Sequence, residues 1–153
     1  MATYQARTRA PRALAPTDGG VDDLLDCAGP IAGAHALVLG PAALEVLCGL
    51  IRYGAAAATC LRRDDRSTAT PAADLVILPR CGKLTETAEA LTLAHRALTP
   101  GGHVVLRDGE SGRGPALATL LAAQGFSHIR CRARPSGAVL TADLPFFGPV
   151  GGR

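Results

Sequence analysis

Aromatic side chains are scarce in this chain of 153 residues, which has no tryptophan, 2 tyrosines and 3 phenylalanines. Proteins that bind single-stranded nucleic acid need aromatic platforms on which bases stack, so the scarcity argues against that class. Lysine is almost absent as well, because Lys83 stands alone among many arginines. The net charge of +3 is small for a dedicated nucleic-acid binder, whose basic side chains usually gather on one face. We therefore expect no nucleic-acid partner.

Long apolar runs and paired cysteines are also missing. No apolar segment approaches the roughly 20 residues that cross a bilayer, so we expect no membrane partner. The 5 cysteines are odd in number and are never spaced as C-x-x-C, which argues against a disulfide framework and against a zinc site. We expect no bound metal, and free thiols in a reducing, cytoplasmic compartment.

What the sequence does contain is enough apolar residues for one globular domain. Hydrophobic residues make up 48% of the chain and charged residues 19%, which excludes a disordered protein. The N-terminal stretch is rich in Arg, Ala and Pro, which favours a flexible arm. An organellar targeting peptide is the alternative, because its arginines stand without acids. We divide the chain into an arm (1–20), a domain (21–144) and a tail (145–153).

Apolar strand patterns alternate with helical patterns along the domain. Residues 36–39 form a strand that is followed by a Gly-Pro turn and a helix at 42–53. We expect strand 74–78 to end at Pro79, and residues 99–102 to form a turn. The full set comprises strands at 36–39, 56–61, 74–78 and 103–107, helices at 21–28, 42–53, 83–98 and 115–124, and a hairpin of 127–134 with 138–143. This order predicts an α/β fold, a Rossmann-like three-layer sandwich with a mainly parallel sheet of about six strands and a terminal antiparallel hairpin.

One passage resembles a known family. Asp74-Leu75-Val76-Ile77-Leu78, then a helix, then the run from His95 to Leu106 (HRALTPGGHVVL) is similar to the class I S-adenosylmethionine-dependent methyltransferases. The resemblance extends from about Ala34 to Leu144. It implies the strand order 2-1-4-5-7-6 in the family's labels. Only a short segment follows Leu61 before the next strand, so we expect the family's third strand to be absent and residues 56–61 to form the sheet edge.

The resemblance also implies a cofactor site, and the sequence departs from the family there. Gly40 matches the first glycine of the family's glycine-rich loop, whereas Ala42 replaces the second and Leu44 the third. We expect the Leu44 side chain to fill the cofactor space and leave a shallow, mainly apolar pocket above Gly40. The family holds the ribose with an acid after the second strand; this chain offers Arg62, or Leu61 if the register slips.

Further candidate positions lie in the loops after strands. Pro79 comes where the family touches its cofactor or methyl acceptor, and Cys81 beside it would need a lowered pKa to be a reactive thiol. Gly112, Arg113 and Gly114 belong to a glycine-rich loop before a helix, which favours an anion-binding site; a plain crossover loop is the alternative. His95 falls on an apolar helical stripe with Leu84, Ala88, Leu91 and Leu98, and we interpret it as a packing residue.

These departures predict a methyltransferase-like domain that has lost catalysis and serves as a binding, regulatory or structural subunit, with no cofactor. An active S-adenosylmethionine-dependent methyltransferase that acts on a small molecule or a protein is the alternative. Phe146 and Phe147 stand side by side between prolines and glycines in a chain poor in aromatics. We therefore expect a protein partner or a second copy of the chain to bind through them, with packing over the hairpin as the alternative.

Overall fold

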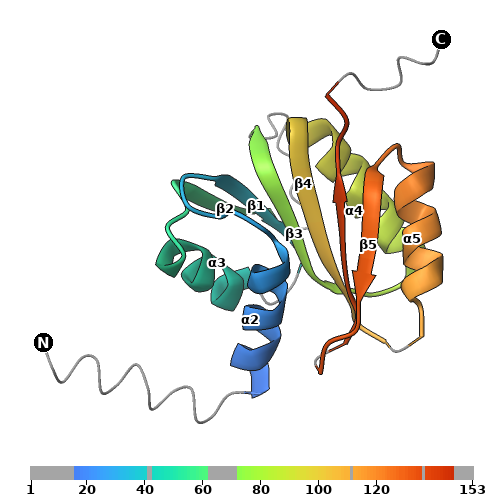
Figure 1. Ribbon diagram of the computed structural model, residues 1–153, viewed down its shortest axis with the longest axis horizontal. Coiled ribbons are helices and arrows are strands. Elements are labelled where there is room, and N and C mark those ends of the chain that lie inside the picture. The colour runs from blue at the N-terminus through green and yellow to red at the C-terminus, as the bar shows by residue number, and fades with distance from the viewer. Residues whose placement is uncertain (1–15, 41–42, 62–71, 111, 136, 147–153) are drawn as a thin grey trace, which may run out of the picture.

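A computed structural model describes residues 16–40, 43–61, 72–110, 112–135 and 137–146. One sheet lies between two pairs of helices, so the domain has three layers (Figure 1). No helix within these ranges is long and apolar enough to cross a membrane. In chain order the elements are α2 (Pro16–Cys27), β1 (His35–Leu39), α3 (Ala43–Arg52), β2 (Ala57–Leu61), β3 (Ala73–Cys81), α4 (Leu84–Ala97), β4 (Leu98–Asp108), α5 (Gly114–Ala123), β5 (Ser127–Arg132) and β6 (Val139–Asp143).

The sheet confirms the expected topology. Its 6 strands follow the order β2-β1-β3-β4-β6-β5. The pairs β1–β2, β1–β3 and β3–β4 are parallel, whereas β6 is antiparallel to both β4 and β5. β2 forms the edge, in register with β1 from His35↔Ala57 to Leu39↔Leu61. Residues 62–71, where a further strand would contradict the prediction, lie outside the described residues.

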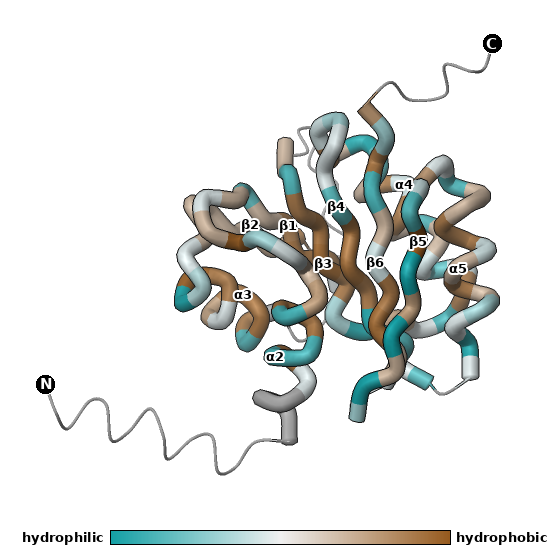
Figure 2. Tube along the Cα trace, viewed as in Figure 1, coloured by the Kyte–Doolittle hydropathy of each residue, from teal (hydrophilic) through white to brown (hydrophobic). Residues whose placement is uncertain are grey.

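Alternating residues of the central strands build a core on each face of the sheet. Leu75 and Ile77 of β3 pack with α2 and α3, while Val76 and Leu78 pack with α4 and α5. All four are at most 3% exposed. A parallel strand that is buried on both faces needs a continuous apolar sequence, which explains the DLVIL run. The brown central strands in Figure 2 show this concentration of apolar residues.

Two predicted strand boundaries are wrong. β3 continues past Pro79 to Cys81, because the β3–β4 register shifts between Leu78 and Cys81 and so accommodates a residue without an N–H. The carbonyl oxygen of Pro79 accepts a hydrogen bond of 3.0 Å from Arg107 Nε. The expected turn at 99–102 lies inside β4, whose pairing jumps from Ala73↔Leu98 to Leu75↔His103. Those residues therefore form an irregularity within a strand.

Two helices also differ from expectation. α2 begins at Pro16, well before Val21, because packing against β4 extends it through Gly20. A Cβ at Gly20 would lie 2.1 Å from Arg107 Nη1, so a larger residue there would require the Arg107 guanidinium to move. In α4 the predicted apolar stripe is rotated. Leu84 is 41% exposed, and the buried residues are Thr87, Leu91, Ala94 and Ala97.

Candidate functional site

A cavity lies at the carboxyl ends of β1, β2 and β3. Its volume is about 530 Å³, and its rim includes Gly40, the residue that follows β1. β1 pairs with β2 on one side and β3 on the other, so the strand order reverses at this place. Ligands of open α/β sheets bind at such switch points, and small-molecule pockets have volumes of roughly 300–1,000 Å³. We call this pocket the carboxyl-end cavity.

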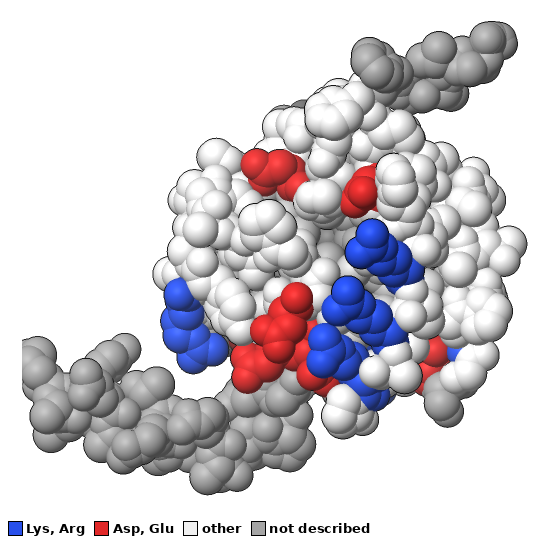
Figure 3. Space-filling model, in the orientation of Figure 1, with Lys and Arg blue, Asp and Glu red and all other residues white. Residues whose placement is uncertain are grey.

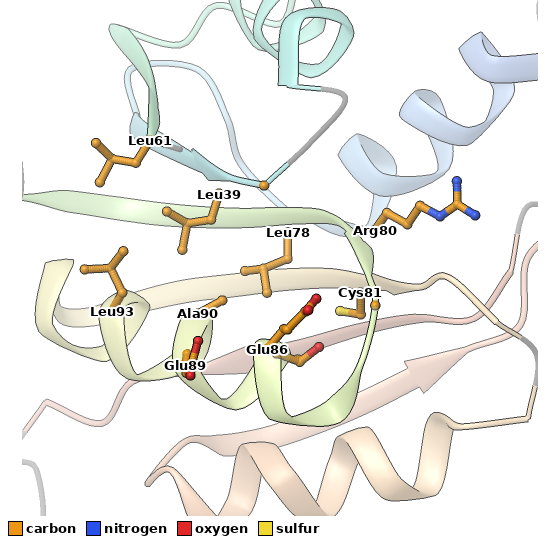
Figure 4. Close-up of a pocket in the computed structure, with 12 residues that line it drawn as sticks. Leu39, Leu61, Leu78, Arg80, Cys81, Glu86, Glu89, Ala90 and Leu93 are labelled. Carbon is orange, nitrogen blue, oxygen red and sulfur yellow. The ribbon is translucent and has the colours of Figure 1, made fainter. Parts of the chain in front are cut away.

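Leucines from three strand ends form one wall of the carboxyl-end cavity. Leu39, Leu61 and Leu78 face Ala90 and Leu93 of α4 (Figure 4). The lining is mainly apolar, as expected. The expectation of a shallow pocket is wrong, because the volume suits a ligand. The remaining lining residues are Gly40, Arg80, Cys81, Gly82, Glu86, Thr87 and Glu89.

The predicted cofactor positions do not come together around the carboxyl-end cavity. Gly40 has a φ of +104°, and a built Cβ there would meet nothing within 4 Å, so the backbone is open to a ligand. Leu44 lies on α3, 72% exposed and outside the lining, so the expectation that it fills the space is wrong. Pro79 is buried within β3 and does not line the cavity. Ala42 and Arg62 lie outside the described residues.

Sequence reasoning missed two acids in the lining, Glu86 and Glu89 on α4. They stand one helical turn apart, beside the apolar positions that pack on the sheet. Each has a partner within the protein. Their spacing on the flank of an apolar stripe was the available signal, but it is equally typical of an ordinary exposed helix face. The carboxyl-end cavity therefore offers negative charge on its α4 side and leucine on its sheet side.

A charged cluster stands beside the mouth of the carboxyl-end cavity. Asp108 is 3% exposed and ends β4. It accepts bonds from the N–H groups of Glu110 and Arg113, each at 3.0 Å, and from Arg113 Nε at 2.9 Å. Arg113 Nη1 and Nη2 donate to the carbonyls of Gly82 and Cys81, at 2.5 and 2.9 Å. This Asp108–Arg113 clasp ties the loop after β4 to the loop after β3.

The Asp108–Arg113 clasp fixes the protonation state of its acid. Burial by itself would raise the pKa of Asp108, but the bonds from Glu110 N–H and from Arg113 outweigh it and lower the pKa. The Arg113 guanidinium is bonded within the protein at all three nitrogens. Gly112 is exposed with a φ of +86°, and Gly114 is buried at the start of α5. The anion site at these residues stays a prediction, and the contacts that are present hold a loop in place.

Neither Cys81 nor His95 is placed for catalysis. Burial raises the pKa of the Cys81 thiol to about 11, although a bond with Thr87 and the charge of Arg113 act in the opposite direction. A thiol that stays protonated is a poor nucleophile. The His95 ring meets Phe126 edge-to-face, with centroids 5.7 Å apart, as expected of a packing residue.

Comparison with solved structures shows that the fold is that of the class I S-adenosylmethionine-dependent methyltransferases. A 1,6-didemethyltoxoflavin-N1-methyltransferase from Burkholderia thailandensis, solved with 1,6-didemethyltoxoflavin and S-adenosylhomocysteine, has a TM-score of 0.66 at 14% identity, covering 94% of this chain and 86% of that one. A methyltransferase from Pyrococcus furiosus has a TM-score of 0.62 at 14% identity, and the match covers 95% of this chain and 100% of that one.

An O-methyltransferase family protein from Burkholderia thailandensis has a TM-score of 0.64 at 14% identity, over 82% of this chain and 55% of that protein. The chain thus spans about half of that protein's length. A scan of family models and a search of curated proteins found no match. At these identities the likeness establishes the fold, and the function has to be argued from the site.

Proposed function

We propose that this chain is a methyltransferase-like domain that has lost methyl transfer and acts as a binding, regulatory or structural subunit. The supporting observation is the position of Leu61. It ends β2 and lines the carboxyl-end cavity, at the strand end where the family offers a carboxylate to the ribose hydroxyls. Its register partner Leu39 is also in the lining, so the wall beneath that position is apolar as well.

The physical consequence is a loss of affinity for the cofactor. A hydroxyl that leaves water without gaining a hydrogen bond costs about 1–3 kcal/mol. Two ribose hydroxyls against leucine therefore cost about 2–6 kcal/mol and weaken binding by roughly 30-fold to 20,000-fold, since each 1.4 kcal/mol is a factor of ten.

The alternative function, an active S-adenosylmethionine-dependent methyltransferase, has one specific observation in its favour. The carboxyl-end cavity is ligand-sized, and Gly40 leaves its backbone open at the rim. Because proximity and alignment supply much of the rate of such transfers, few side chains would be needed. The neighbours that hold S-adenosylmethionine or S-adenosylhomocysteine in their structures make this cofactor the first ligand to test.

Calorimetric titration with S-adenosylmethionine and S-adenosylhomocysteine separates the two functions. The proposal predicts no binding tighter than about 1 mM. A cavity-filling variant, Ala90→Trp, is the matched control, because Ala90 faces the leucine wall from α4. Micromolar binding by the native chain that Ala90→Trp abolishes would establish the alternative. Micromolar binding that Ala90→Trp leaves unchanged would overturn the proposal as well, and would place the cofactor outside the cavity.

The proposed partner contact is the C-terminal tail. Phe146 is 73% exposed, with its ring against Gly101, where a built Cβ would lie 2.7 Å from Phe146 Cζ. Phe147 lies outside the described residues. An exposed aromatic ring held on a glycine backbone is the type of rigid anchor that protein interfaces use. A second copy of this chain or another protein would bury it.

A further inference from the structure

The sheet face that carries α2 and α3 presents a ladder of basic and histidine side chains across β4, β6 and β5. Val105 and Val139 belong to the core on this face, so their direct register partners share it. The successive rungs are His103–Asp143, Val105–Thr141–Arg130 and Arg107–Val139–Arg132. In Figure 1 α3 lies to one side of these strands, and α2 contacts β4 and β6 at one end of the face.

A groove of about 290 Å³ opens on this ladder. It shares no lining residue with the carboxyl-end cavity. Its floor consists of the first two rungs, and the chain just after α2 closes one side. We call it the histidine groove; its lining residues are Cys27, Ala28, Gly29, Pro30, His103, Val105, His128, Arg130, Thr141 and Asp143.

One carboxylate positions both imidazoles of the histidine groove. Asp143 Oδ1 lies 2.5 Å from His103 Nδ1, and Asp143 Oδ2 lies 3.4 Å from His128 Nδ1. The carboxylate accepts a hydrogen bond from His103 Nδ1, which leaves Nε2 of that ring for another partner, whereas His128 Nδ1 also lies 3.4 Å from Ser127 Oγ. Asp143 also lines the groove, so an anion bound there must contact the basic and imidazole side chains and keep away from this carboxylate.

The backbone at His128 is held in an unusual conformation to make this arrangement. Its φ of +53° is the only left-handed value among the described non-glycine residues. The β5–β6 register shifts between Ser127 and Arg130, so His128 sits in the irregularity. Such a conformation is unfavourable for a residue with a side chain and tends to occur where function requires it. Here it brings a second imidazole to Asp143.

Both basic and acidic side chains lie on this face, and the basic ones form a group. Figure 3 shows basic side chains gathered over the strands of this face, next to acidic side chains near α2. Arg130 lines the histidine groove, and Arg132 and Arg107 occupy the rung below it. Arg134 donates to Cys27 Sγ at 3.5 Å, at the α2 side. Guanidinium groups beside imidazoles form a common oxyanion-binding set.

We propose that the histidine groove binds a small phosphate monoester. Arg130 contacts the phosphate oxygens, Thr141 donates its hydroxyl, and the rings of His103 and His128 supply further polar contacts. The groove has room for one phosphate group and part of its organic substituent. This proposal is independent of the function of the carboxyl-end cavity.

Nuclear magnetic resonance of the histidine rings tests the proposal on the native chain. The sequence has 4 histidines, and His35 and His95 lie outside the groove, so they serve as internal references. Inorganic phosphate and adenosine monophosphate should shift the ring nitrogens of His103 and His128 saturably at constant pH. Adenosine, which lacks the phosphate, should shift none. Equal shifts at all four rings, or none with either phosphate, would overturn the proposal.

Variants locate the site. Arg130→Gln should weaken phosphate binding at least tenfold, whereas Arg96→Gln, an exposed arginine of α4 on the other face, should leave it unchanged. His128→Asn keeps a residue that tolerates positive φ while removing the imidazole, and should also weaken binding at least tenfold. Equal affinities for the three variants would contradict the proposal. A single-stranded oligonucleotide provides a further test. The proposal would be contradicted if the oligonucleotide shifted the ring signals of His103 and His128 and adenosine monophosphate did not, because the ligand would then be a polymer.

Discussion

Asp108→Asn should be among the most destabilising single substitutions outside the apolar core. The Asp108 side chain is 1% exposed and that of Arg113 17%, and Nη2 lies 2.8 Å from Oδ1. Removing one member of a buried pair costs about 3–5 kcal/mol, and the partial exposure of Arg113 favours the lower value. For a chain of this size each kcal/mol shifts the melting temperature by about 2–4 °C, so we expect a decrease of roughly 6–12 °C.

Thermal and urea unfolding measure this change, with Glu110→Gln as the matched control. Glu110 is 70% exposed and its carboxylate is 3.9 Å from Arg113 Nε, so removing its charge should change the stability by less than about 0.5 kcal/mol. If Asp108→Asn lowered the free energy of unfolding by no more than Glu110→Gln does, the structural role of the Asp108–Arg113 clasp would be refuted.

The same pair predicts an acid dependence. The pKa of Asp108 is lowered in the folded state, so the folded protein keeps the carboxylate ionised at a pH where the unfolded chain binds a proton. Its stabilisation is therefore complete above the ordinary carboxyl pKa of about 4 and is lost as the pH falls through the lower folded value. The difference in stability between the native chain and Asp108→Asn should shrink only in that acid range. A difference that is already lost at neutral pH would contradict the assignment.

Three further predictions concern the cavity, the thiols and the tail. Leu61→Asp should raise the affinity for S-adenosylhomocysteine about tenfold, measured by calorimetry, because the carboxylate can accept a charge-assisted hydrogen bond from the ribose. Leu61→Asn should raise the affinity less. An unchanged affinity in Leu61→Asp would show that Leu61 is not what weakens cofactor binding. Iodoacetamide at pH 8 should label the exposed Cys48 and Cys131 long before the buried Cys81, as read by mass spectrometry, and early labelling of Cys81 would contradict its raised pKa. A chain ending at Leu144 should keep its melting temperature within a few degrees and lose association with its partner in light scattering, whereas a large decrease in melting temperature would make the tail part of the core.

The fold could be predicted because its signals are local and strong. The buried strand DLVIL must be apolar on both faces. Strand order followed from the resemblance and from the short segment between Leu61 and Asp74. The errors occurred where tertiary contacts override local preference. Packing on Arg107 extends α2 through Gly20, and a register shift lets β3 continue past Pro79.

The site was harder to predict because it depends on side-chain direction. Gly40 was identified correctly as a rim residue, but Leu44 points to solvent because Val46 and Leu50 occupy the buried face of α3. Helical phase decides such questions, and a one-residue error reverses the conclusion. The pairing of His103 with His128 through Asp143 could not be foreseen, since it arises from the β5–β6 register and a positive φ.

The most direct test of the proposed loss of the cofactor site is the methyl signal of S-adenosylmethionine labelled with ¹³C at the sulfonium methyl. With an excess of the native chain, the signal should keep the width and position of the free cofactor, because the leucine side chains in the wall of the carboxyl-end cavity cannot form hydrogen bonds with the ribose hydroxyls. Saturable broadening or a shift of that signal, removed by Ala90→Trp, would show that the cofactor binds in the cavity and would contradict the account.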